Sequence, residues 1–272
     1  MQFGEKFPCA MGDAKLRIGI VRMKNFLQSL SDDAICNMPE DDTICDMHEN
    51  NYKKTTTLMG LYEFLAYVAH FQQPWLVGSL SLRMVELSMK TDMSAMSPLA
   101  FAHFGGVLVS AGCIAEGCRF GEYFWLGNLT SLCMCSASYP LIGKLAFKLV
   151  EKKGSLQYTS RVIYFVYHNI LWASYPLQMI VEFHMLGHKA GQQSGDIVFS
   201  INNLLVAIVT DYVVGQSFDI VLKNMLDFIS KLQNHGVRVF RKGAILLLSQ
   251  IMVLKEGPHM SSVTHVDNMP SE

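Results

Sequence analysis

Charged residues are few in this chain, and neither sign is in excess. Lys and Arg number 22, Asp and Glu number 23, and the formal net charge is −1 over 272 residues. A protein with this balance lacks the broad positive surface that nucleic-acid binding requires. The seven cysteines include no CxxC pair. An odd number of cysteines without metal-binding spacing predicts reduced, mostly buried thiols in a cytoplasmic protein.

Catalytic motifs are missing as well. The sequence contains no GxxxxGK[ST] P-loop and no HRD or DFG kinase signature. The five glycines between positions 105 and 121 do not follow a predicted strand, so they do not form a phosphate-binding loop. Met1 is not followed by a basic segment and an apolar core, as a secretory signal would require. We therefore expect a cytoplasmic protein that is not an enzyme and has no cofactor.

Three stretches of 20 or more residues contain no Asp, Glu, Lys or Arg: 93–115, 123–143 and 162–181. Each is long enough to cross a bilayer, so a polytopic membrane protein is the alternative interpretation. The stretches include His103 and His168, and lipid would penalise such polar side chains. Buried helices of a stacked array also lose charges on most faces. For these reasons we favour a soluble helical array.

Apolar residues recur with helical periodicity along most of the chain. The stretch 97–121 predicts a helical hairpin with a turn at Gly112. Ser97 is placed to cap the first helix and Pro98 fits its first position. Small residues in this hairpin allow close helix packing of the tetratricopeptide type, and they are Gly105, Gly117 and Gly121.

Further helices are expected at 13–30, at 52–71, at 74–90, in a hairpin at 156–193 that turns near 173–176, in a hairpin at 196–234 that turns at Gly215, and at 237–254. Their predicted inner stripes are Leu16, Ile20, Met23, Phe26 and Leu27 in the first, Leu58, Leu61, Phe64, Leu65 and Val68 in the second, and Leu80, Leu82, Met84, Val85 and Leu87 in the third. We expect residues 1–12 to be an irregular lead-in, 31–50 an acidic connector and 255–272 a disordered tail.

Three glycines recur at a constant interval. Gly154, Gly195 and Gly236 are spaced by 41 residues, and each closes a polar helix end, where a left-handed C-cap favours glycine. Two helices with their turns occupy about 40 residues in helical solenoids. The sequence therefore predicts an all-α fold of tetratricopeptide-like helical hairpin repeats, an α-solenoid of about ten or eleven helices over residues 13–254.

Several segments, taken in order, resemble a known family. They are LQSLSDDAICNMPE, LSLRMVELSMKTDMSAMSP, SPLAFAHFGG…GCRFG, KLAFKLVEK, RVIYFVYHNILWASYPL and GHKAGQQSGD. This series, which covers residues 15–254, is similar to the tetratricopeptide-like helical region of large multidomain signalling proteins. Those proteins join a protein-kinase-like domain, an AAA-type ATPase, a GAF domain and often a histidine kinase. The resemblance implies a non-catalytic scaffold that binds a protein partner, or the other domains of a parent protein, and relays a signal.

One segment departs from the family pattern. Residues 122–143, EYFWLGNLTSLCMCSASYPLIG, separate two motifs that adjoin in the family, and deleting these 22 residues places Ala146 three positions after Gly121. The codons of 121–123 can hold GTGAGTA and those of 142–143 can hold ATAGG, which resemble intron boundaries. Two interpretations remain: a retained intron translated in frame, and a genuine loop insertion. Sequencing the transcript distinguishes them.

Two histidine spacings suggest candidate sites. His184 and His188 lie at i and i+4 on one predicted helix, a spacing that can hold zinc, although no Glu lies between them as a metalloprotease base. We expect an interface histidine pair there, with metal binding as the alternative. His168 and Trp172 have the same spacing, and the resemblance places them with Pro176 in an aromatic–proline corner. A cation or nucleotide stacked on Trp172 is the second interpretation.

Overall fold

The computed structural model describes residues 13–31, 34–35, 45–90, 94–113, 146, 156–173, 175–234 and 240–256. Within these ranges the chain forms nine α-helices and two short 3₁₀-helices, with no strand. The predicted all-α fold is confirmed, although the described ranges hold fewer helices than the ten or eleven predicted. The chain divides into an N-terminal unit, Met1–Ser174, and a C-terminal unit, Tyr175–Glu272.

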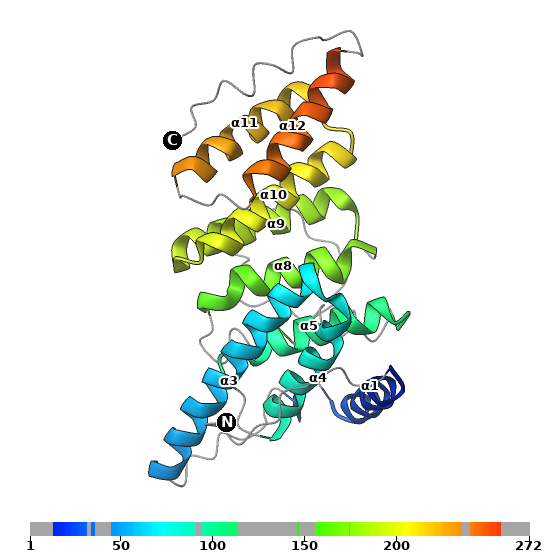
Figure 1. Ribbon diagram of the computed structural model, residues 1–272, viewed down its shortest axis with the longest axis vertical. Coiled ribbons are helices and arrows are strands. Elements are labelled where there is room, and N and C mark those ends of the chain that lie inside the picture. The colour runs from blue at the N-terminus through cyan, green and yellow to red at the C-terminus, as the bar shows by residue number, and fades with distance from the viewer. Residues whose placement is uncertain are drawn as a thin grey trace. The chain divides into compact units, whose positions relative to one another are not determined.

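The N-terminal unit is a series of packed helices (Figure 1). They are α1 (Asp13–Gln28), α3 (Cys45–Gln72), α4 (Pro74–Lys90), α5 (Ser97–Ser110) and α8 (Thr159–Asn169), with the 3₁₀-helices η2 (Leu156–Tyr158) and η3 (Leu171–Ala173) at the ends of α8. Helix α3 packs against α4, α4 against α5, and α5 against α8, while α1 also lies on α4. Packing that follows chain order is typical of helical hairpin repeats.

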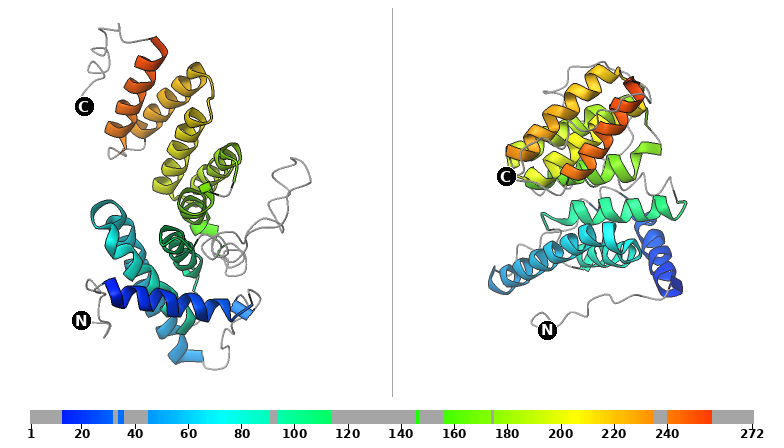
Figure 2. Two further views of the ribbon diagram at one scale, coloured as in Figure 1. Left: turned by 90° about the vertical axis from the view of Figure 1, so that its right-hand side faces the viewer. Right: turned by 45° about the horizontal axis from the view of Figure 1, so that its top comes forward.

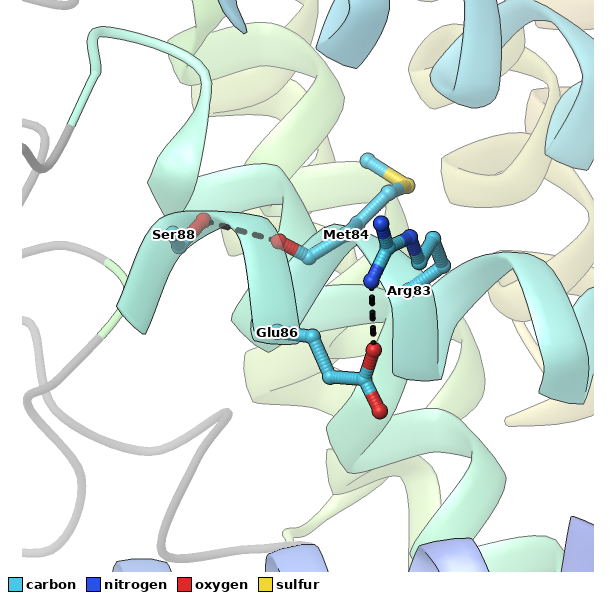
Figure 3. Close-up of polar contacts among 4 residues, drawn as sticks. All are labelled: Arg83, Met84, Glu86 and Ser88. Carbon is cyan, nitrogen blue, oxygen red and sulfur yellow. Dashed lines mark hydrogen bonds and ion pairs between the residues drawn. The ribbon is translucent and has the colours of Figure 1, made fainter. Parts of the chain in front are cut away.

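Helix α4 has the bounds that the sequence predicts. All five residues of its expected inner stripe are buried: Leu80, Leu82, Met84, Val85 and Leu87. The buried Ser88 donates its hydroxyl proton to the Met84 carbonyl at 3.0 Å, which satisfies the hydroxyl inside the helix. On the same helix, Arg83 Nη1 lies 2.8 Å from Glu86 Oε2 in a partly exposed pair (Figure 3).

Helix α3 differs from the prediction at its start and in its buried face. It begins at Cys45, so the predicted connector at 31–50 is helical at its C-terminal end. Leu58 of the expected inner stripe is buried, but the rest of the stripe is exposed: Leu61, Phe64, Leu65 and Val68. The helix buries Met59, Tyr62 and Ala66 instead. Periodicity identified an apolar stripe, but the packing of α4 and α5 determines which face is covered.

Helix α1 follows its predicted stripe only in part, since Leu16, Ile20 and Met23 are half-buried. Leu27 is fully buried and Phe26 is 48% exposed. The helix approaches α4 closely because Gly19 has no side chain, since a Cβ there would lie 2.6 Å from Leu82 Cδ2. Sequence reasoning did not assign Gly19 this role, although a glycine inside a helix often marks a close contact.

The hairpin predicted at 97–121 is described through its turn. Gly112 has φ of +82°, which confirms the turn there. The predicted cap at Ser97 is wrong, because Met96 occupies the N-cap position and makes no side-chain capping bond. Ser97 is the first helical residue, and its hydroxyl oxygen accepts a hydrogen bond from the Ser94 N–H at 3.0 Å. Its Oγ thus closes the preceding turn.

The structure describes only some of the small residues that the sequence predicts to allow close helix packing. Gly105 is buried in α5, and Ala146 is buried and helical. Gly117, Gly121, Gly154, Gly236 and the segment 122–143 lie outside the described residues. At the neighbouring Gly106, a Cβ would make an ordinary van der Waals contact with Asn169 Cβ at 3.4 Å, so the packing of α5 on α8 does not require glycine there.

The C-terminal unit contains four helices, α9 (Leu177–Ser194), α10 (Ile197–Val213), α11 (Phe218–Asn234) and α12 (Arg241–Glu256). Each packs against the next, and Figure 2 shows α11 and α12 side by side. The predicted C-cap at Gly195 is confirmed by φ of +79°, and the predicted turn at Gly215 by φ of +82°. An apolar core joins α10, α11 and α12 around Met225, Phe228 and Leu248.

The ends of the described chain bear on two further predictions. Helix α12 extends to Glu256, so the expected tail at 255–272 begins with two helical residues. The lead-in at 1–12 and residues 257–272 lie outside the described part of the chain. Across the described ranges, no helix combines the length and the apolarity that crossing a bilayer requires.

Candidate functional site

A cleft of about 510 Å³ opens in the N-terminal unit, among α1, α3, α4, α5 and the C-terminal end of α8. Its walls are Leu16, Ile20, Ala66, His70, Pro74, Trp75, Val77, Gly78, Ala102, His103, Gly106, Val107, Ser110, Ala111, Phe165, His168, Asn169 and Trp172. Three histidines and two tryptophans contribute to it, whereas Asp, Glu, Lys and Arg do not. A mainly apolar cleft of this size with a few polar groups is typical of small-molecule sites.

His103, on α5, is the most buried polar residue of the cleft, with 6% of its surface exposed. Its ring packs on Phe165 of α8 with 4.0 Å between centroids. Within the described part of the chain, His103 Nε2 is buried and has no hydrogen-bond partner. Burial, with a smaller contribution from His70, lowers the pKa of His103 to about 3. At neutral pH the ring is therefore uncharged, with one nitrogen donor and one acceptor.

The predicted aromatic–proline corner takes a different form. His168 is exposed at the cleft and stacks on Tyr164 with 5.1 Å between ring centroids. Partial desolvation of its ring, followed by the neighbouring His70, lowers its pKa. Trp172, expected to pack at the corner, is 56% exposed and lies at the cleft. Pro176 is the N-cap residue of α9 in the other unit. The structure thus brings His168 and Trp172 to one cleft together with His103, which the sequence had not linked to them.

The predicted histidine pair on α9 is buried against α10. His184 Nδ1 donates to Asn203 Oδ1 at 2.7 Å, and Asn203 Nδ2 donates to the Phe199 carbonyl at 2.8 Å. The second bond orients the Asn203 amide, so its oxygen faces His184. Because that oxygen can only accept, His184 carries its proton on Nδ1.

His188 is bonded to the same neighbouring helix. Its Nδ1 donates to the Ser200 carbonyl at 3.0 Å and lies 2.8 Å from Ser200 Oγ. The Ser200 hydroxyl in turn donates to the His188 carbonyl at 2.8 Å. Burial lowers the pKa of His188, the Ser200 hydrogen bond raises it, and Lys231 lowers it further. Both histidines thus act as links between α9 and α10.

Gly187, between the two histidines, makes this close packing feasible. A Cβ at that position would lie 2.6 Å from Asn203 Cγ and Oδ1. Sequence reasoning missed Gly187 as a packing residue. The sequence did carry a signal for this role. A glycine inside a helix costs about 1 kcal/mol relative to alanine, so a glycine within a predicted helix suggests a close packing contact.

The described residues offer no third ligand for a zinc ion at His184 and His188, which was the alternative interpretation of this pair. Glu182, the nearest candidate, is exposed, and no group of three or more His, Cys, Asp or Glu in the described ranges is placed to hold a metal ion. The bonds to Asn203 and Ser200 support the interpretation of an interface pair.

Comparisons with protein-family models, with curated proteins and with solved structures found no match to this chain. The resemblance to the helical region of multidomain signalling proteins stays a prediction, and function is argued from the geometry.

Proposed function

We propose that this chain is a non-catalytic helical scaffold that binds a protein partner through one face of α3. The face consists of Leu61, Phe64, Leu65 and Val68, all exposed and spaced at i, i+3, i+4 and i+7. Phe64 alone is 61% exposed. Solvent-facing apolar residues at this spacing match the anchors by which one helix docks on another.

The opposite face of α3 is held firmly by its own unit. Glu63 Oε2 lies 2.9 Å from Arg161 Nη1 of α8, and the Glu63 side chain is almost fully buried. Met59 and Tyr62 are completely buried beside it. The exposed stripe is therefore presented by a helix whose orientation is fixed, which lowers the entropy cost of binding.

The resemblance suggests where such a partner would be found. In a longer signalling protein with ATPase and kinase domains, the partner would be another domain of the same chain, and the helices would relay its movement. In a free-standing adaptor, the partner would be a separate protein with an apolar helix face. Both arrangements use the same stripe.

Photocrosslinking tests the proposal. We expect p-benzoylphenylalanine in place of Phe64 to form discrete adducts in cells, whereas the same residue in place of the exposed Lys189 of α9 does not. The double variant Leu61→Glu/Leu65→Glu should lose the Phe64 adducts while keeping its melting temperature, because both side chains are exposed. Equal adducts at the two positions, or adducts that persist in the double variant, would contradict the proposal. An adduct of twice the chain mass would identify a second copy as the partner.

A further inference from the structure

The cleft of the N-terminal unit has a chemistry distinct from the α3 stripe. Its lining contains no Asp, Glu, Lys or Arg. A charged ligand that entered would lose water without gaining an opposite charge, which is costly. The lining therefore favours an uncharged ligand, and only its aromatic rings could attract a cation.

Aromatic side chains define the shape of that ligand. Trp75 on α4 and Trp172 on η3 line the cleft, and each is more than half exposed, at 55% and 56%. Phe165 lies deeper and is nearly buried. Exposed indole rings beside an apolar cleft favour stacking on a flat ring system, which also covers the apolar surface of the indoles.

His103 supplies a polar anchor at the buried end. Only 6% of its surface is exposed, and its Nε2 has no hydrogen-bond partner in the described part of the chain. Buried polar atoms in folded proteins are nearly always bonded, and an exception calls for a ligand or another explanation. Asn169, at the end of α8, adds an amide to the same wall.

We propose that this cleft binds a small, uncharged, planar heteroaromatic ligand that stacks on Trp75 and Trp172 and hydrogen-bonds His103 Nε2. A two-ring system fits a volume of about 510 Å³. The ligand needs a polar edge that can both donate and accept, as a lactam does. This proposal does not rest on the α3 partner, since none of the four stripe residues lines the cleft.

The test uses quinolin-2(1H)-one, a neutral bicyclic lactam, with the full chain in isothermal titration calorimetry or saturation-transfer NMR. We expect a Kd of about 1 mM, the usual scale for a ligand of this size. The anion quinoline-2-carboxylate, which has the same two rings, should bind at least about tenfold more weakly because the cleft offers no positive side chain.

Variants locate the binding. Trp172→Ala should weaken quinolin-2(1H)-one binding several-fold, and Ala111→Trp should abolish it by filling the cleft from an exposed position. Leu246→Ala, exposed on α12 and outside the cleft, serves as the control with unchanged affinity. His103→Leu should weaken binding of the lactam but not of naphthalene, which has no polar edge. If His103→Leu does not fold, Trp172→Ala and Ala111→Trp still show whether the ligand binds in the cleft.

Two results would overturn the proposal. One is the absence of quinolin-2(1H)-one binding to the unaltered chain at several times the expected Kd. The other is an affinity that is the same in Ala111→Trp as in the unaltered chain. Failure of the α3 crosslinks would leave this result unaffected, so the two proposals fail separately.

Discussion

The two units bury histidines in contrasting ways. In the C-terminal unit, His184 and His188 each donate an Nδ1 hydrogen bond to α10, at 2.7 Å and 3.0 Å. In the N-terminal unit, His103 is similarly buried, yet its ring makes no hydrogen bond to a neighbouring helix within the described chain and lines an open cleft. Burial alone therefore does not separate a structural histidine from a binding one. The Nδ1 hydrogen bond to a neighbouring helix separates them, and an unbonded Nε2 does not, because His184 Nε2, like His103 Nε2, is a buried nitrogen that makes no hydrogen bond in the described chain.

Helical spacing did not identify the histidine that lies at the cleft. The i, i+4 spacing drew attention to His184 and His188 as metal candidates, whereas His103 had no partner at helical spacing. In the structure, His184 and His188 take part in helix packing, whereas His103 lies at the cleft.

The largest expected effect comes from the close contact between α9 and α10. Gly187→Ala places a methyl group 2.6 Å from the Asn203 side chain and should destabilise the protein by about 2 to 3 kcal/mol, because the bonded, buried amide has no room to move. Urea unfolding measures the loss.

Gly243→Ala is the matched control in the same unit. A Cβ at Gly243 meets nothing within 4 Å, so alanine should stabilise α12 by about 0.5 to 1 kcal/mol. If the two alanine variants had equal stability, the close packing at Gly187 would be contradicted.

Removing an imidazole tests the difference between the units directly. His184→Leu removes the donor of the buried hydrogen bond to Asn203 Oδ1 and should cost about 2 kcal/mol. His103→Leu removes no described Nε2 bond and should cost about 1 kcal/mol or less. Guanidinium unfolding of both variants at pH 7.5 provides the comparison.

The double variant His184→Leu/Asn203→Leu should recover part of the loss, because it removes both partners of that hydrogen bond. Similar costs for His103→Leu and His184→Leu would remove the distinction between the two histidines.

The smaller effects concern pH. His103 has a folded-state pKa of about 3, against 6.5 for an ordinary histidine, so below pH 6.5 the unfolded chain binds more protons than the folded one. The stabilising contribution of neutral His103 is complete above pH 6.5 and is lost as the pH falls toward 3. From pH 7.5 to 5.0 this loss is about 2 kcal/mol.

Two histidine variants, one in each unit, show how much each histidine contributes to this loss of stability at low pH. His103→Leu should lose less stability than the unaltered chain when the pH drops from 7.5 to 5.0. His188→Leu should change the pH dependence less, because the Ser200 hydrogen bond offsets part of the pKa lowering. Urea titrations at the two pH values measure this, and unchanged acid sensitivity in His103→Leu would show that His103 is not buried in its neutral form.

Local signals predicted much of the fold. Apolar spacing located α4 at Pro74–Lys90, and glycine located the turns at Gly112 and Gly215 and the left-handed C-cap at Gly195. These features depend on residues close in sequence, so a single chain reveals them.

Tertiary features were harder to predict. The α3 stripe around Phe64 was assigned to the core because periodicity shows that a helix is amphipathic but not which face its neighbours cover. The cleft was missed because its walls come from five α-helices and the 3₁₀-helix η3, and no local pattern links His103 to Trp75. Trp172 was noticed, but its exposure depends on the end of α8.

The most direct test of the account observes the histidine nitrogens themselves. In protein labelled with ¹⁵N-histidine, long-range ¹H–¹⁵N spectra are recorded before and after addition of quinolin-2(1H)-one, with His103→Leu to assign the signal. We predict that the His103 Nε2 resonance moves as it gains a hydrogen bond, while His184 and His188 keep their Nδ1 protons and do not shift. An unmoved His103 signal, or shifts confined to His184 and His188, would contradict the account.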